Sequence, residues 1–171
     1  GDPGNNVPED RESLEIWKSL GIPEDKIFFG GIEDNFWGPT GSSGPCGPTT
    51  ELHIDGLEVW NIVFNEYLCD ASRESLLKGS ANLAPLTRKG VDTGMGLERL
   101  ILILQNKKSV FETDLFVPLL TELRGRNLYD YESNQKSERI IADHLKTSAF
   151  IISDGVAPSN TERGYVLRRL I

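Results

Sequence analysis

Cysteine is scarce in this sequence of 171 residues, which has two, Cys46 and Cys69, and no Cys-x-x-Cys pair. Two cysteines are too few for a disulfide framework. Long hydrophobic runs are missing as well, since none approaches the ~20 residues that span a bilayer. The opening GDPGNNVPED does not have the pattern of a signal peptide. These absences predict a reduced, cytoplasmic protein with no membrane partner.

Positive charge is also in short supply. The chain has 18 Lys and Arg against 26 Asp and Glu, a net charge of -8. This balance argues against a nucleic-acid-binding surface over the whole protein. The charge is uneven, however: residues 1–35 hold nine acids against three bases, and from Lys136 onward six bases face four acids. A basic end on an acidic protein indicates an anionic partner at that end, although solvated helix faces would give the same composition.

The length suits one domain, or one domain with part of a second. Apolar periodicity and start and stop signals predict four helices, over residues 11–21, 97–106, 113–123 and 137–153. A last helix is expected to begin at Ser159 or Asn160 as its N-cap. It breaks off in the middle of its pattern, in RRLI, which indicates a truncated chain.

Strand signals dominate the middle of the chain. A short strand is expected at residues 27–30, and residues 38–50, dense in Gly, Pro, Ser and Thr, are expected to form a loop. Two strands then follow, 51–55 and 57–67, joined by a hairpin turn at Asp55 and Gly56.

Alternation along the second of these strands sorts its side chains onto two faces. One face mixes small apolar residues with amides, namely Val59, Asn61, Val63 and Asn65. This mixture is unusual both for a pure core and for a pure solvent face. It suits the floor of a ligand pocket.

The stretch GVDTGMGLERL, residues 90–100, combines glycines with an acid and an arginine. Val91 is expected to end a strand, and the glycines to make a turn before the next helix. A dinucleotide-binding fingerprint fails because Arg99 occupies the third glycine position, and a P-loop fails because no Gly-Lys-Ser/Thr follows. The pattern still places an acid able to hold an ammonium group near a helix-start arginine suited to a phosphate. A surface pair of Glu98 and Arg99 beside a turn is the equally open alternative.

This stretch resembles motif 3 of the class II aminoacyl-tRNA synthetases, in the form found in alanyl-tRNA synthetases. Three further segments agree with the same family and occur in its order: DNFWGPTGSSGPCGPTTELHID, EVWNIVFNEY and IADHLKTSAFIISDGVAPSNTERGYVLRRLI. Motif 3 alone specifies only the class, whereas FW followed by GPCGP, WNIVF and PSNxxRGYVLRR together are specific for the alanine enzymes. The resemblance covers most of the chain from Asp34 to Ile171.

The resemblance implies an α+β fold, an antiparallel β-sheet flanked by helices, followed by an α-helical segment. Residues 1–125 would be the later part of the catalytic domain, and residues 126–171 the start of the helical tRNA-recognition domain. The family joins alanine to ATP to give alanyl-adenylate and pyrophosphate, usually with Mg²⁺, and then transfers alanine to the 3′ end of tRNA(Ala). Catalysis of this kind rests mainly on positioning and on stabilising charge on phosphoryl oxygens.

Motif 3 supplies several implied site residues. Arg99 matches the arginine that holds ATP phosphate, and Gly96 belongs to the same nucleotide site. Asp92 matches the acid that pairs with the ammonium of alanine, and Gly94 lets the substrate approach the backbone. Glu51, in the strand after the GPCGP loop, has an implied magnesium or ribose role, against the alternative of an exposed strand face.

The implied alanine pocket lies on other segments. Trp37, Asn61 and Val63 match its lining, with Asn61 binding the carboxylate and the other two bounding the methyl group. His53 stands where an aromatic residue is expected and receives no role. Thr49 replaces the second cysteine of many members, which removes any case for a metal at Cys46, and the zinc of the family belongs to an editing domain outside this segment.

The end of the chain resembles the part of the family that binds the tRNA acceptor stem. Asn160 matches an asparagine that helps to read a G·U pair, since an amide can both donate to and accept from base edges. Arg163, Arg168 and Arg169 would contact phosphates, which accounts for the local basic bias. A plain helix N-cap is the alternative for Asn160.

Motifs 1 and 2 of the family, including its α-phosphate arginine, are expected upstream of residue 1. The isolated chain is therefore expected to form little or no adenylate, and the remainder of the same synthetase is an expected partner. The competing hypothesis is a non-catalytic, synthetase-derived RNA-binding or regulatory module. The intact set of Asp92, Asn61 and Arg99 argues against it.

Overall fold

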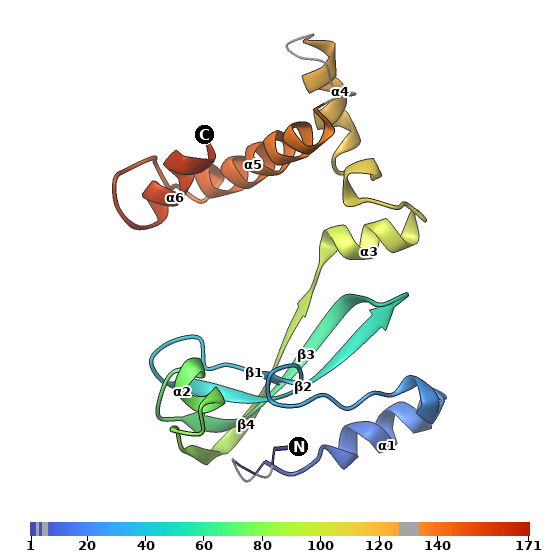
Figure 1. Ribbon diagram of the computed structural model, residues 1–171, viewed down its shortest axis with the longest axis vertical. Coiled ribbons are helices and arrows are strands. Elements are labelled where there is room, and N and C mark those ends of the chain that lie inside the picture. The colour runs from blue at the N-terminus through green and yellow to red at the C-terminus, as the bar shows by residue number, and fades with distance from the viewer. Residues whose placement is uncertain (3, 5–6, 127–133) are drawn as a thin grey trace. The chain divides into compact units, whose positions relative to one another are not determined.

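The computed structural model describes residues 1–2, 4, 7–126 and 134–171, and the chain divides into two compact units, residues 1–97 and 98–171. An antiparallel sheet of four strands organises the first unit (Figure 1). Its strands follow one another in the order of the sequence: β1 (Phe36–Trp37), β2 (Gly44–Ile54), β3 (Leu57–Cys69) and β4 (Leu83–Met95). With helices in both units, this confirms the predicted α+β class and its antiparallel sheet.

The hairpin between β2 and β3 is the predicted one. Asp55 and Gly56 both have positive φ angles, 52° and 80°, and separate Ile54 from Leu57. Two left-handed residues in succession match the right-handed twist of the flanking strands. Asp and Gly tolerate that conformation better than most residues, which is why the turn could be recognised in the sequence.

The expected loop at residues 38–50 is wrong in its second half, because β2 begins at Gly44. The pairing of β2 with β3 is interrupted between Cys46 and Thr49. A Cβ atom at Gly47 would overlap the carbonyl oxygen of Phe64 on β3, so the glycine permits a close approach of two strands. The glycine and proline content therefore reflects an irregular strand and not a free loop.

The expected turn at the glycines of motif 3 is also wrong. β4 continues from Leu83 through Gly90 and Gly94 to Met95, and α3 (Leu97–Leu104) begins two residues later. Each glycine is paired with a residue of β3. Cross-strand hydrogen bonds with β3 thus outweigh the weak intrinsic preference of glycine for strands.

The remaining elements of the first unit lie beside the sheet. Helix α1 (Arg11–Ser19) is capped by Asp10, whose Oδ1 accepts from the backbone N–H of Ser13 at 2.9 Å. The short helices η2 (Glu24–Lys26) and α2 (Arg73–Leu77) follow, and residues 27–30 form no strand, which contradicts that expectation. The core of this unit consists of Val7, Phe36, Cys46, Cys69 and Leu76.

The second unit is helical. After α3 come η3 (Val110–Glu112), α4 (Val117–Gly125), α5 (Gln135–Ser153) and α6 (Glu162–Leu170). Helix α4 begins at Val117, later than the expected start at residue 113, and Pro118 is its second residue, a first-turn position where a proline loses no hydrogen bond. The N-cap of α6 is Thr161, one residue beyond the two expected candidates. None of the described helices is both long enough and apolar enough to span a membrane.

An ion pair between an exposed guanidinium, Arg124, and a buried carboxylate, Glu138, joins α4 to α5. Both oxygens of Glu138 accept from Arg124, at 2.6 Å from Nε and 2.7 Å from Nη2. The Glu138 side chain is 1% exposed and packs beside a core of Phe116, Leu120 and Ala142. The predicted domain boundary at residues 125/126 falls beside residues 127–133, which lie outside the described residues, and it stays a prediction.

Candidate active site

The register of the sheet brings five of the predicted site residues onto one face. In one row Thr49, Val63 and Asp92 lie directly opposite one another across β2, β3 and β4. In the next row of the same face, two residues along β3, stand Glu51, Asn61 and Gly94. Directly opposed side chains of antiparallel strands have Cβ atoms about 5 Å apart. Residues separated by more than 40 positions therefore form one small patch.

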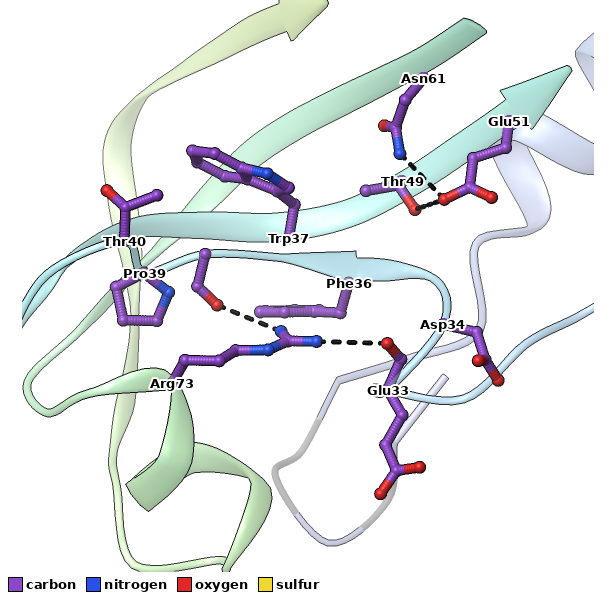
Figure 2. Close-up of a pocket in the computed structure, with 11 residues that line it drawn as sticks. Glu33, Asp34, Phe36, Trp37, Pro39, Thr40, Thr49, Glu51, Asn61 and Arg73 are labelled. Atoms are coloured by element: carbon purple, nitrogen blue, oxygen red, sulfur yellow. Dashed lines mark hydrogen bonds between the residues drawn. The ribbon is translucent and has the colours of Figure 1, made fainter. Parts of the chain in front are cut away.

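Trp37 reaches this region through β1, which pairs with β2. A cavity of about 340 Å³ opens there, and Trp37, Thr49, Glu51 and Asn61 all line it (Figure 2). The acids Glu33 and Asp34 and the cation Arg73 complete its polar wall. Val63, Asp92 and Gly94 share the face of Asn61 but are outside the lining of this cavity.

Glu51 is the centre of a hydrogen-bond cluster on this wall. Its Oε1 accepts from Nδ2 of Asn61 at 2.9 Å and from Oγ1 of Thr49 at 3.4 Å, as Figure 2 shows. Its Oε2 lies 3.0 Å from Nε2 of His53. The carboxylate thus orients the Asn61 amide and contacts His53, a residue for which no role was predicted.

Asn61 retains unused hydrogen-bonding capacity. Its Oδ1 is buried and has no partner among the described residues, and the same holds for Oδ1 of Asn65 on the same face. Buried polar atoms are nearly always paired, so an unpaired acceptor beside a cavity points to a ligand or a water molecule. With Nδ2 donating one hydrogen to Glu51, a second N–H remains for a ligand oxygen.

Asp92 lies on the exposed strand β4, where its Oδ1 accepts from the backbone N–H of Thr93 at 2.8 Å. Thr93 in turn ties β4 to β3: its Oγ1 donates to the carbonyl of Asn61 at 3.1 Å and accepts from Nε1 of Trp60. Trp60 and Thr93 brace the two strands that carry Asn61 and Asp92. The sequence offered no signal for this contact, because 33 positions separate the two residues.

The residues predicted to bind ATP lie at the start of α3. Gly96 precedes the helix, and its backbone N–H donates to the carbonyl of Val59 at 3.1 Å. Arg99 stands in the first turn of α3, as predicted, and belongs to the second unit. The N-terminus of a helix favours anions because its first backbone N–H groups have no partner within the helix.

The residues predicted to bind tRNA are spread along the last helix: Asn160 precedes α6, Arg163 stands in its first turn, and Arg168 and Arg169 stand in its last turn. Nη1 of Arg168 donates to Oδ1 of Asn160, so this arginine contacts the amide expected to read the acceptor stem. Gly164 is buried against the loop before the helix, and a Cβ atom there would overlap Ser159. The side chains of Arg163 and Arg169 are exposed, and Arg169 lies 6.0 Å from the ring centroid of Tyr165.

Cys46 is a buried thiol and not a site residue. It is free, as is Cys69, and burial, reinforced by Cys69, raises the pKa of its thiol to about 11. Such a thiol is protonated near neutral pH and is a poor nucleophile or metal ligand. Within the described ranges, no three His, Cys, Asp or Glu side chains gather as they would around a metal ion.

Comparison with known proteins shows the family to which the chain belongs. The family model described as tRNA synthetases class II (A) matches residues 5–171. The chain belongs to this family. Relatives named alanine–tRNA ligase share 43% identity over 188 residues in Borreliella afzelii and 42% over 195 residues in Rubrobacter xylanophilus. The relative of that name in Candida albicans is 40% identical over 198 residues.

The alignments also show what fraction of each relative's length the chain spans. These alignments cover 96%, 97% and 100% of this chain but 30%, 21% and 20% of the respective relatives. The chain therefore spans between a fifth and a third of the length of these class II synthetases.

Proposed function

We propose that this chain is part of an alanine–tRNA ligase, which activates alanine with ATP to alanyl-adenylate and transfers it to the 3′ end of tRNA(Ala). The observation that carries the proposal is the shared face of β2, β3 and β4. It presents an acid, an amide, a small apolar side chain and a glycine in two adjacent rows, namely Asp92, Asn61, Val63 and Gly94. Alanine offers the matching groups: an ammonium, a carboxylate and a methyl.

Each group has a proposed partner. The Asp92 carboxylate pairs with the ammonium, and the remaining N–H of Asn61 donates to the carboxylate. Val63 and Trp37 bound the methyl group, and Gly94 leaves room for the substrate beside the backbone. Glu51 acts by holding the Asn61 amide in the orientation that this contact needs. This positioning role differs from the direct ribose or magnesium contact implied by the resemblance.

ATP is a substrate of the proposed reaction, and Arg99 is its proposed phosphate ligand. The position of Arg99 in the first turn of an eight-residue helix fits that role, because the planar guanidinium and the helix N-terminus both favour an anion. Magnesium would neutralise charge on the phosphates when bound with ATP. The described residues form no acidic cluster that would hold it by themselves.

Helix α6 and the segment just before it are proposed to meet the tRNA acceptor stem. Asn160 presents an amide whose oxygen is held by Arg168, which leaves Nδ2 to donate to a base edge. Arg163 and Arg169 are proposed to contact phosphates, and such contacts contribute affinity without sequence information. A location in the cytoplasm accords with the two free cysteines and stays part of the proposal.

The test is amino-acid-dependent ATP–pyrophosphate exchange by the full-length protein. Alanine is expected to support exchange better than glycine by about 10- to 200-fold, since one methyl group contributes about 1–3 kcal/mol of discrimination. Exchange that prefers another amino acid would contradict the proposal.

A second arm uses the 171-residue chain, which spans only part of its relatives. Alone it is expected to give little or no exchange, and activity is expected to return when the remaining polypeptide of the same protein is added. Failure of the wild-type full-length protein to catalyse exchange, combined with retained binding of tRNA, would favour the non-catalytic RNA-binding module instead.

A further inference from the structure

The segment between β3 and β4 is a closed loop that carries α2. Its two ends are tied at Asp70 and Asn82: the backbone N–H of Asp70 donates to the carbonyl of Asn82 at 3.2 Å, and the backbone N–H of Asn82 donates to Oδ1 of Asp70 at 2.8 Å. The Asn82 amide donates to the other carboxylate oxygen at 2.8 Å. Leu76 of α2 is fully buried in the core of the first unit. The backbone of α2 is thereby fixed beside the sheet.

Arg73, the first residue of α2, extends from this fixed helix to the segment that leads into β1. Its Nη2 donates to the carbonyls of Ile32 at 2.7 Å and Glu33 at 3.4 Å, and its Nη1 donates to the carbonyl of Gly38 at 3.1 Å. The guanidinium also lies 6.0 Å from the ring centroid of Phe36. Figure 2 shows the two side chains beside each other. One side chain thus connects the two ends of residues 32–38.

Trp37 lies within the segment that Arg73 holds. Phe36, on one side of it, is 5% exposed and packs in the core, whereas Gly38, on the other side, accepts a hydrogen bond from Arg73. Trp37 itself is 40% exposed and lines the cavity together with Arg73. Its position depends on the backbone on both sides, and Arg73 contacts both.

We propose that Arg73 is a positioning residue for the amino-acid pocket, setting the place of Trp37 by clamping residues 32–38 to α2. The proposal rests on the proposed function, because it assigns Trp37 to the wall of the alanine pocket. The geometry of the clamp requires arginine. Three carbonyls on one segment need a planar group with several N–H donors in fixed directions, which the single ammonium of lysine does not supply.

The contacts distinguish this role from direct binding of an anion. Three hydrogen bonds of Arg73 run to backbone carbonyls of residues 32–38, and the acids Glu33, Asp34 and Glu51 line the same cavity. An anionic substrate group would compete with three carbonyls and face three carboxylates. Arg73 therefore acts through the backbone that carries Trp37.

The test compares Arg73→Met, Arg73→Lys and the control Lys78→Met in the full-length protein by ATP–pyrophosphate exchange. Lys78 is a cation at the opposite end of the same helix, and its salt bridge to Glu74 is exposed, so its loss is expected to change nothing. Arg73→Met is expected to raise the KM for alanine about tenfold and to leave the KM for ATP within about twofold, because only the alanine pocket is displaced. Arg73→Lys is expected to lie much closer to Arg73→Met than to the wild type.

A double-mutant cycle with Trp37→Ala separates positioning from a general loss of stability. If Arg73 acts through Trp37, then Arg73→Met is expected to have little further effect on the KM for alanine once Trp37 is truncated. Additive effects of the two substitutions would overturn the proposal, as would an unchanged KM in Arg73→Met or full activity in Arg73→Lys. If Arg73→Met does not fold, the same cycle is measured with Arg73→Lys.

The wild-type protein separates this inference from the proposed function. If the wild type shows no alanine-dependent exchange, both are overturned. If the wild type is active and the Arg73 variants are unaffected, only this inference is overturned.

Discussion

The Asn61 amide shows how one residue depends on its neighbours in this site. Glu51 holds its nitrogen, Thr93 holds its backbone carbonyl, and its side-chain oxygen stays buried without a partner among the described residues. Strand alternation was enough to predict that Asn61 and Val63 share a face, because the side-chain period of a strand is two. The contacts of Thr93 and Arg73 could not be predicted, since Thr93 lies 32 positions from Asn61 and Arg73 lies 35 positions from Gly38. Glu51, by contrast, lies only 10 positions from Asn61, across the predicted hairpin.

The buried Glu138 carboxylate gives a prediction about the second unit. Glu138→Gln is expected to lower the free energy of unfolding by about 2 kcal/mol, because a neutral amide cannot accept both charged hydrogen bonds from Arg124 and remains buried. The exposed pair of Arg126 and Glu122 supplies the control: Glu122→Gln is expected to change the free energy by less than about 0.5 kcal/mol. Urea unfolding followed by far-ultraviolet circular dichroism measures both. Equal effects of the two substitutions would contradict this account of the pair.

The Cys46 thiol gives a prediction about reactivity. Because burial raises its pKa from the ordinary 9.0 to about 11, Cys46 is expected to react with a thiol reagent at pH 7 only after unfolding. The chain carrying Cys69→Ala isolates this thiol, and rapid reaction of the native protein would contradict its burial.

The same shift has a consequence at alkaline pH. A pKa raised in the folded state contributes stability that is complete below the unfolded value and is lost as pH rises through the folded value. Stability is therefore expected to fall between pH 9 and about 11. Cys46→Ala is expected to remove the contribution of the Cys46 thiol to this loss of stability. The contributions of other groups remain, such as that of Tyr67, whose pKa is also raised by burial.

At the scale of whole elements, the helices were the easier part of the fold to predict. Helix α5, for example, carries a long amphipathic pattern and runs from Gln135 to Ser153, close to the expected bounds. The strands β2 and β4 were misjudged, because their Gly and Pro residues are typical of loops and turns. In the structure these residues are held in the sheet by partners on β3 that the local sequence does not reveal.

Gly47 tests the close approach of β2 to β3. Gly47→Ala is expected to destabilise the first unit by about 3 kcal/mol or more, because the new methyl group would overlap the backbone of Phe64. Gly90→Ala is the matched control on β4, where an added Cβ meets nothing within 4 Å. All three tryptophans lie in the first unit, so fluorescence-monitored unfolding reports on it. Similar midpoints for the two variants would contradict the proposed strand contact.

At the scale of the whole molecule, the two units differ in charge. Residues 1–97 contain 7 Lys and Arg against 16 Asp and Glu, a net charge of -9, whereas residues 98–171 contain 11 against 10, a net charge of +1. The acidic unit carries the proposed alanine pocket, and the nearly neutral unit carries Arg99 and the proposed tRNA contacts. This division accords with a small zwitterionic substrate on one unit and a polyanion on the other.

Alanine binding by the shared face of β2, β3 and β4 is the core of the proposed function. Its most direct test is alanine-dependent ATP–pyrophosphate exchange by the full-length protein carrying Asp92→Asn, beside the wild type and Asp25→Asn, which alters an exposed acid on η2. Asp92→Asn is expected to lower kcat/KM for alanine by at least about 100-fold, because the charged partner of the ammonium is removed. Asp25→Asn is expected to keep the wild-type value. Wild-type kcat/KM for alanine in Asp92→Asn would contradict the proposed function.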